Sequence, residues 1–205
     1  MKVRGITDAT TITTTGAYSC ALHQDGTISC WGNNDYGQLG NGEGGGGYDS
    51  GDRSLVPVQV QDITDATTIT TNGSEISGHS CALHEDGTIS CWGNNSYGQL
   101  GNGTGGNYED YSSVPVKVRG ITDATTITAG YAYSCALHED GTISCWGYNE
   151  DGQLGNGTGG NDEYRSLVPV QVQDITDATT ITTSGSHSCA LHEDGTISCL
   201  SLIHI

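Results

Sequence analysis

Residues Ser19–Cys30 read Ser-Cys-Ala-Leu-His-Gln-Asp-Gly-Thr-Ile-Ser-Cys. A turn of the Asp-Gly kind between two short apolar segments is typical of a β-hairpin. The segment returns three more times, with Glu in place of Gln as its one variation, at Ser80–Cys91, Ser134–Cys145 and Ser188–Cys199. The chain is therefore a tandem repeat, and its architecture follows from one repeat unit.

Two further motifs recur with the hairpin. Ile-Thr-Asp-Ala-Thr-Thr-Ile-Thr precedes it, beginning at Ile6, Ile63, Ile121 and Ile175. Trp-Gly-x-Asn-x-x-Gly-Gln-Leu-Gly-Asn-Gly follows it from Trp31, Trp92 and Trp146, and leads into an acidic Gly-rich loop and Val-Pro-Val. The spacing between copies suits one four-stranded propeller blade. We predict a single all-β domain over residues 1–199, with repeat units 6–62, 63–120, 121–174 and 175–199.

The composition restricts the partners. The 205 residues contain 24 Asp and Glu against 6 Lys and Arg, for a net charge of -18. Such acidity often indicates disorder, but here the apolar residues recur in short runs at fixed spacing, which predicts strands. An acidic surface repels phosphate backbones, so we expect no nucleic-acid partner. No run approaches the eighteen or so apolar residues that span a bilayer, so we expect no membrane insertion in this segment.

Both ends interrupt the repeat. Lys2–Ile6 matches Lys117–Ile121, which places Met1 where Val116 stands, so we expect the true N-terminus to lie further upstream. After Cys199 the expected Trp-Gly is replaced by residues 200–205, Leu-Ser-Leu-Ile-His-Ile. This hexapeptide resembles a translated sequencing adaptor, and we predict that it is a non-native tail.

Residues 31–40, Trp-Gly-Asn-Asn-Asp-Tyr-Gly-Gln-Leu-Gly, together with the preceding Asp-Gly-Thr hairpin, resemble the regulator-of-chromosome-condensation repeat. The resemblance covers nearly the whole chain and is strongest to the bacterial, cysteine-paired, secreted kind. Members of that family fold as seven-bladed β-propellers. The resemblance thus implies four-stranded antiparallel blades, about three and a half of seven, in an open fragment.

The hairpin places its two cysteines opposite each other. A three-residue loop with Gly26 in the left-handed conformation pairs His23 with Thr27, which brings Cys20 opposite Cys30 at a non-hydrogen-bonded position. Strands approach most closely there, at a distance that suits a disulfide. The same count pairs the remaining cysteines as Cys81 with Cys91, Cys135 with Cys145 and Cys189 with Cys199. Four disulfides favour an extracellular or cell-surface location, or the periplasm, whereas eight reduced thiols would indicate the cytosol.

A zinc site is the main competitor for the cysteines. Cys20 and His23 lie three apart on one strand and so point to opposite faces, which argues against a shared metal. We expect the repeated histidines, His23, His84, His138 and His192, to cap their hairpins opposite a threonine. The position before Ser-Cys alternates between Tyr and His, at Tyr18, His79, Tyr133 and His187, which indicates packing. No acid, base and nucleophile converge in the sequence, so we predict no enzyme activity.

The variable loops are the candidate binding residues. They pair tyrosine with acid on a constant framework, and tyrosine is a favoured anchor at recognition surfaces. The residues are Tyr48, Asp49, Asp52, Tyr108, Glu109, Asp110, Tyr111, Asp162, Glu163 and Tyr164. Unconstrained drift of the loops is the alternative explanation. Their clustered oxygens are also compatible with calcium, although a solvated acidic loop is the simpler interpretation. We expect no other cofactor.

These observations predict a non-enzymatic scaffold that binds an unknown protein partner through its loops. The alternative is a carbohydrate-binding or adhesive module that uses one tryptophan per unit, although Trp31, Trp92 and Trp146 belong to the framework motif. The family resemblance also implies guanine-nucleotide exchange as a possible activity. That activity depends on a wedge-like insertion, which this sequence lacks.

Overall fold

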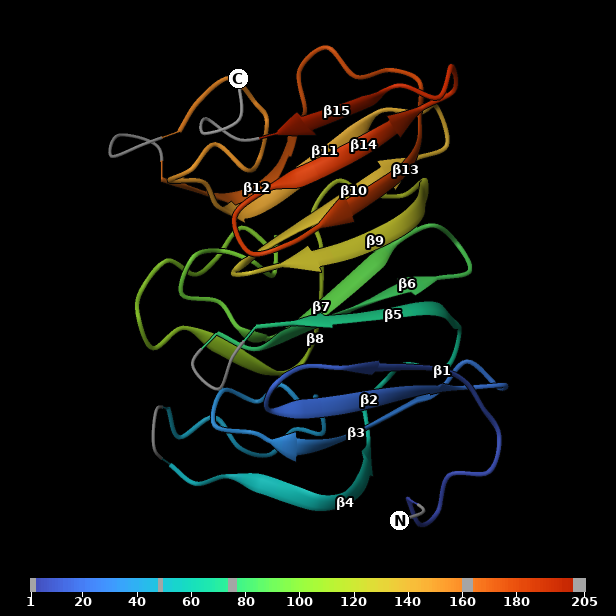
Figure 1. Ribbon diagram of the computed structural model, residues 1–205. Coiled ribbons are helices and arrows are strands. Elements are labelled where there is room, and N and C mark those ends of the chain that lie inside the picture. The colour runs from blue at the N-terminus through green and yellow to red at the C-terminus, as the bar shows by residue number, and fades with distance from the viewer. Residues whose placement is uncertain (1–2, 48–49, 74–76, 160–163, 201–205) are drawn as a thin grey trace.

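The computed structural model describes residues 3–47, 50–73, 77–159 and 164–200. These residues form four antiparallel sheets that follow one another in chain order along the molecule (Figure 1). The first sheet contains β1 (Ala9–Thr14), β2 (Tyr18–His23), β3 (Ile28–Asn33) and β4 (Arg53–Gln59). The second contains β5 (Ala66–Asn72), β6 (His79–His84), β7 (Ile89–Asn94) and β8 (Tyr111–Lys117).

The third sheet contains β9 (Ala124–Gly130), β10 (Tyr133–His138), β11 (Ile143–Tyr148) and β12 (Arg165–Gln171). The fourth contains β13 (Ala178–Thr183), β14 (Ser188–His192) and β15 (Ile197–Leu200). In every sheet the strands lie in sequence order. This is the meander of a propeller blade, and the predicted all-β fold of four-stranded antiparallel blades is confirmed.

The hairpin register is the predicted one. The backbone N–H of His23 donates to the carbonyl of Thr27 at 2.9 Å, and Gly26 adopts a φ of 77°. Cys20 lies opposite Cys30 with their Cα atoms 4.1 Å apart, and the two sulfurs are bonded. The other hairpins repeat this arrangement, with disulfides Cys81–Cys91, Cys135–Cys145 and Cys189–Cys199.

The tail predicted at residues 200–205 begins inside the last strand. Leu200 pairs with Ser188 and ends β15. It also packs against the third apolar cluster, at the position that Trp92 and Trp146 occupy in their own repeats. Residues 201–205 lie outside the described residues.

The core lies between the blades. Ile69, Ala82 and Trp92 of the second blade pack against the first blade's disulfide and the neighbouring Leu22 and Ile28. Two further clusters of the same composition join the second blade to the third and the third to the fourth. Each blade thus buries its apolar face against the next blade, as expected when a repeat is too thin to enclose a core of its own.

Polar contacts reinforce each junction. The indole N–H of Trp92 donates to the carbonyl of Gln38 at 3.0 Å, and that of Trp146 donates to the carbonyl of Gln99 at 2.9 Å. Ser80 also donates to the carbonyl of Gln38. Buried polar groups are stable when they are paired in this way. The Gly-Gln-Leu-Gly turn of one blade therefore supplies a backbone carbonyl that accepts hydrogen bonds from the next blade.

The alternating Tyr and His position does more than the predicted packing. The Tyr18 hydroxyl donates to the carbonyl of His79 at 2.6 Å, and burial raises the pKa of this phenol. His79 in turn shares a 2.9 Å hydrogen bond between its Nε2 and the hydroxyl of Ser134. Tyr133 donates to the carbonyl of His187 at 2.7 Å. Tyrosine and histidine can both hydrogen-bond to the following blade from this position, which explains why either residue occurs there.

Removing one disulfide should lower stability. In the double variant Cys81→Ala/Cys91→Ala, the unfolded chain regains the freedom of the closed loop, so the free energy of unfolding should fall by roughly 2 to 3 kcal/mol. Urea denaturation followed by circular dichroism measures the change. Alanine at both positions leaves the neighbouring blades in place, so a loss of β signal before urea is added would contradict this local role.

His79 should make the protein sensitive to acid. Burial lowers its pKa from 6.5 to about 4, so between these values the unfolded state binds the proton and the folded state does not. Stability is therefore retained above pH 6.5 and falls as the pH drops towards 4, by up to about 3 kcal/mol. Urea midpoints measured from pH 7.5 to 4 should change less steeply in His79→Tyr, which installs the residue that the first and third blades use.

His187→Tyr, at a half-buried position of the fourth blade, is the matched control for replacing histidine by tyrosine. Equal pH slopes for the wild type and His79→Tyr would show that another group causes the acid sensitivity.

Candidate functional site

The variable loops gather on one rim of the molecule. They connect β3 to β4, β7 to β8 and β11 to β12, and all three lie on the left side of Figure 1. The short hairpins of the repeat lie on the opposite, right side. This separation arises because the strands of each sheet alternate in direction, so every second connection emerges on the same side.

An asparagine fixes the base of each loop. The side-chain oxygen of Asn95 accepts the backbone N–H of Leu100 at 3.1 Å, and its amide donates to the carbonyl of Thr104 at 3.0 Å. Its own backbone N–H donates to the carbonyl of Asp110 at 2.7 Å, where the loop returns to the sheet. Asn34 and Asn149 make the corresponding contacts in the first and third loops.

The second loop is tied down along its length. Ser96 donates from its hydroxyl to the carbonyl of Tyr108 at 2.7 Å. The carboxylate of Asp110 accepts both the backbone N–H of Asn107, at 2.8 Å, and its side-chain amide, at 3.0 Å. The ring of Tyr108 nevertheless remains 68% exposed. A pinned backbone that carries an exposed aromatic ring loses little entropy when it binds.

Neighbouring loops touch. The space beyond Gly45 of the first loop is filled by the ring of Tyr111, at the start of β8. The guanidinium of Arg165, at the start of β12, donates to the carbonyl of Gly106 in the second loop and stands 4.8 Å from the ring centre of Tyr164. The first residue of each outer strand thus supports the loop of the preceding blade, and the three loops form a continuous rim.

The structure tests the placement of six of the predicted residues. Tyr108, Tyr111 and Tyr164 are 68%, 41% and 37% exposed, and Glu109 is exposed. Asp52 and Asp110 are half-buried, and their carboxylates accept hydrogen bonds within their own loops. Outside the described residues lie Tyr48, Asp49, Asp162 and Glu163. The exposed recognition candidates are therefore the tyrosines and Glu109, while the two aspartates serve the loop itself.

The structure gathers no metal-ligand cluster within the residues it describes. No group of three or more His, Cys, Asp or Glu side chains among them is placed to hold an ion. The predicted zinc alternative fails for a specific reason, since the cysteines are bonded to each other and His23 binds other partners. Calcium stays an untested alternative at the first and third loops, since Tyr48, Asp49, Asp162 and Glu163 lie outside the described residues.

The repeated histidines occupy a site that the sequence analysis missed. In every blade an aspartate, the histidine and a serine form a chain: Asp65 Oδ1 lies 2.6 Å from His84 Nδ1, and His84 Nε2 lies 2.9 Å from Ser90 Oγ. The equivalent groups are Asp8, His23 and Ser29; Asp123, His138 and Ser144; and Asp177, His192 and Ser198. The expectation that no acid, base and hydroxyl converge was wrong.

The setting of this chain favours a structural role. Ser90 lies inside β7, between Ala82 of β6 and Lys117 of β8, so the surrounding backbone is engaged in the sheet. Acyl transfer needs free N–H groups aimed at the developing oxyanion, and a paired strand supplies none. The sequence carried a signal for this chain, because an aspartate precedes the histidine in every unit. The separation is 19 residues in the second unit and 15 in the other three.

The tryptophans are framework residues. Trp92 and Trp146 are fully buried, and their indole N–H groups are bonded to the preceding blade. Trp31 is half-buried because no described blade precedes the first one. The two buried rings have no face to offer a sugar, so the carbohydrate-binding alternative loses two of the three tryptophans that suggested it.

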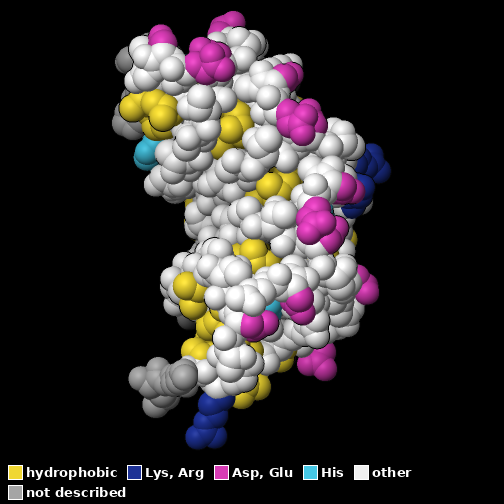
Figure 2. All heavy atoms as spheres, turned by 90° about the vertical axis from the view of Figure 1, so that its right-hand side faces the viewer, with side chains coloured by type: hydrophobic (Ala, Val, Ile, Leu, Met, Phe, Trp, Pro, Cys, Tyr) yellow, Lys and Arg dark blue, Asp and Glu magenta, His cyan; other side chains and the backbone are white. Residues whose placement is uncertain are grey.

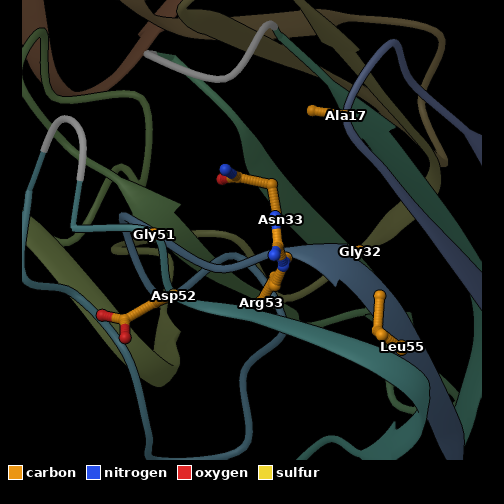
Figure 3. Close-up of a pocket in the computed structure, with 7 residues that line it drawn as sticks. All are labelled: Ala17, Gly32, Asn33, Gly51, Asp52, Arg53 and Leu55. Atoms are coloured by element: carbon orange, nitrogen blue, oxygen red, sulfur yellow. The ribbon is translucent and has the colours of Figure 1, made fainter.

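A hollow of about 250 Å³ adjoins the first loop. Figure 3 shows its lining, which comes from the ends of β3, the start of β4 and the two adjacent loops and includes Asn33, Asp52 and Leu55. In the next two blades the position of Leu55 is held by Ser113 and Leu167, whose carbonyls accept the N–H of Gly42 and Gly103 from the preceding blade, both at 2.9 Å. In the second and third blades, a turn of the preceding blade therefore occupies the place that corresponds to this hollow.

The hairpin rim is also acidic (Figure 2). Each hairpin carries an Asp, and all but the first add a Glu. The hydroxyl of Thr27 and its backbone N–H both donate to Asp25 and hold the pKa of that carboxyl below its usual value; Asp86, Asp140 and Asp194 are held in the same way. These aspartates stabilise the turn, and the glutamates remain as solvated charge.

No helix formed by the described part of the chain is long and apolar enough to cross a bilayer.

The fold and repeat together define a class, the propellers built from chromosome-condensation repeats. The profile of the Regulator of chromosome condensation (RCC1) repeat matches residues 25–74, 86–137 and 140–191, and a second RCC1 profile matches 11–38 and 124–153. These matches cover most of the chain, and the protein belongs to the RCC1 repeat family.

Relatives are similar over most of this chain but much longer. E3 ubiquitin-protein ligase HERC2 of Homo sapiens is 27% identical over 88% of this chain and 4% of its own length. RCC1 domain-containing protein RUG3, mitochondrial, of Arabidopsis thaliana is 31% identical over 89% of this chain and 39% of its own length. Yeast RCC1 (Prp20), in its crystal structure with Kap60, superimposes with a TM-score of 0.77 at 19% identity, over 97% of this chain and 45% of the other.

Replacing a side chain by alanine should lower stability at the base of the second loop more than at its tip. Asn95→Ala removes the two side-chain hydrogen bonds of Asn95 and leaves the N–H of Leu100 and the carbonyl of Thr104 without this partner, so we expect a loss of about 1 to 3 kcal/mol in stability and faster amide exchange in the loop. Tyr108→Ala, which removes an exposed ring, should change stability by less than about 0.5 kcal/mol. Urea denaturation and hydrogen exchange measure both. Equal losses would contradict the division into base and tip.

Proposed function

We propose that this chain is a non-enzymatic, protein-binding scaffold, secreted or displayed on a cell surface, and that its loop rim contacts the partner. The observation that carries the proposal is the pairing of hydrogen-bonded loop bases with exposed tyrosines, of which Tyr108 lies within the second loop and Tyr111 and Tyr164 lie where the second and third loops return to the sheet. Tyr108, Tyr111 and Tyr164 project from backbones that hydrogen bonds hold in place. Rigid aromatic anchors of this kind contribute most of the binding energy at protein interfaces.

The chemistry of the rim indicates the partner's surface. Glu109 is exposed beside Tyr108, and the chain as a whole carries a net charge of -18. A positively charged protein surface would associate fastest with such a rim, and the rate would fall as salt screens the attraction. The first residues of the outer strands add two arginines: Arg53, which is exposed, and Arg165, whose guanidinium contacts Gly106 and Tyr164.

Two further observations support the proposal. Four disulfides are compatible with an oxidising location, because bonds of this kind are rare in the cytosol. The yeast relative is a propeller of the same fold in complex with a protein, Kap60. The absence of enzyme activity is part of the proposal, and it is supported by the strand-bound setting of the Asp-His-Ser chains.

Selection from a displayed library of folded protein domains tests the loop rim. Domains that bind the wild type should lose at least tenfold in affinity for Tyr108→Ala/Tyr111→Ala, since a tyrosine hot spot contributes about 1 to 2 kcal/mol or more. Their association rates should fall as salt rises from 50 to 500 mM. Biolayer interferometry measures both quantities.

The matched control is Glu85→Ala/Glu139→Ala, which alters two exposed acids on the opposite, hairpin rim. Domains that bind the tyrosine variant as tightly as the wild type, but bind the hairpin variant more weakly, would place the binding surface on the hairpin rim. Binders lost equally with both would point to non-specific attraction to acid.

A further inference from the structure

A buried glutamine in each of the first two blades is paired with an asparagine at the end of the third strand. In the second blade, Gln99 donates from Nε2 to the side-chain oxygen of Asn94 at 2.7 Å. The same oxygen accepts the backbone N–H of Ser96 at 2.9 Å. Gln38 and Asn33 repeat the glutamine–asparagine pair in the first blade at 2.5 Å. Each asparagine therefore satisfies a donor that the fold buries.

The third blade departs from this pattern. Tyr148 stands at the place of the asparagine, and a tyrosine ring offers no amide oxygen there. Gln153 is fully buried, and its Nε2 has no hydrogen-bond partner among the described residues. An unpaired buried donor destabilises a fold. A residue that lowers stability within an otherwise regular repeat indicates a functional site, because function is where proteins depart from the rules of their own fold.

Tyr148 makes two contacts of its own on the loop rim. Its ring meets the ring of Tyr97, from the second blade, edge to face, with the ring centres 4.8 Å apart. Its hydroxyl donates to the carboxylate of Glu150. Both tyrosines are half-buried, and Glu150 is exposed. The rings lie where β7 and β11 lead into their loops, on the left side of Figure 1.

Two carboxylates stand beside this pair of rings. Burial, the hydrogen bond to Glu150 and the charges of Glu150 and Asp151 raise the pKa of the Tyr148 hydroxyl. No lysine or arginine among the described residues forms an ion pair with either acid. Arg165, the cross-strand neighbour of Tyr148, uses its guanidinium on the second loop. We call Tyr97, Tyr148, Glu150 and Asp151 the tyrosine niche.

We propose that the tyrosine niche binds an arginine side chain of the protein partner. A planar guanidinium can stack on an aromatic ring and donate two parallel hydrogen bonds to a carboxylate, which a lysine ammonium does not match. The inference rests on the proposed function, because it names the partner group that this part of the loop rim binds. It also explains why tyrosine is kept beside an unpaired glutamine: the ring adds binding where asparagine would add stability.

Exchanging the two residue types tests the effect on stability. Tyr148→Asn supplies an acceptor for Gln153 and should raise the melting temperature by about 2 to 10 °C. Asn94→Tyr, the matched reverse change, removes the acceptor of Gln99 and should lower it by a similar amount. Differential scanning calorimetry measures both. A melting temperature of Tyr148→Asn at or below that of the wild type would overturn the inference.

An arginine probe tests the site itself. The peptide Gly-Gly-Arg-Gly-Gly, acetylated and amidated, should bind the wild type in the millimolar range and shift the ring resonances of Tyr97 and Tyr148 in NMR spectra. Tyr148→Asn and Glu150→Gln should each weaken binding by about fivefold. Glu139→Gln removes the same charge from the hairpin rim of the same blade, so it is the matched control and should bind like the wild type. The lysine version of the peptide should bind more weakly.

Three results would overturn the niche: equal losses with Glu150→Gln and Glu139→Gln, which would show general attraction to acid, unchanged affinity of Tyr148→Asn, or equal binding of the lysine peptide. The selected domains separate this inference from the proposed function. Domains that are lost with Tyr108→Ala/Tyr111→Ala but not with Tyr148→Asn would keep the loop rim and reject the niche. Domains that bind the hairpin rim, together with a probe that binds the niche, would reject the proposed function and keep the arginine site.

Discussion

The structure depends on the burial of one isoleucine from each innermost strand against the hairpin of the blade before it. A blade of this protein is a single sheet, and a single sheet cannot enclose its own apolar side chains. Ile69, Ile127 and Ile181 therefore reach their burial only through a neighbour. Stability is shared between adjacent units, as in other repeat arrays.

The disulfides make this arrangement possible with few large side chains. The chain contains no Phe and one Met. A bonded cysteine pair at the close point of each hairpin adds apolar volume to the junction and restricts the unfolded chain. The polar contacts then fix the orientation of the blades, because Tyr18, His79 and Tyr133 each bond to the following blade. Apolar packing stabilises the junction between two blades, and the hydrogen bonds fix the orientation of one blade relative to the next.

The division between rims follows from strand direction. Hairpins of fixed sequence turn on one side, where Asp25 and its equivalents bond to a threonine. Loops of varied length and sequence turn on the other, where Asn34, Asn95 and Asn149 fix only the base. Because the framework contacts each loop at its two ends, the residues of the tip can vary without changing the framework. Exposed Tyr108 lies within the second of these loops, and Tyr111 and Tyr164 lie where the second and third loops return to the sheet.

The sequence alone determined everything local and periodic. The repeat length follows from the recurrence of the motifs, and the Asp-Gly turn and the pairing of Cys20 with Cys30 follow from short-range geometry, which acts within about ten residues. Contacts between units were decided by the tertiary structure, because they join residues far apart in the sequence, such as Trp146 and Gln99 at a separation of 47, and depend on how one blade sits on the next. The bond from Tyr18 to the carbonyl of His79 and the bond from the N–H of Gly42 to the carbonyl of Ser113 belong to this class. The chain from Asp65 through His84 to Ser90 lies within one blade, but it too depends on tertiary structure, because the aspartate approaches the histidine only once β5 has paired with β6.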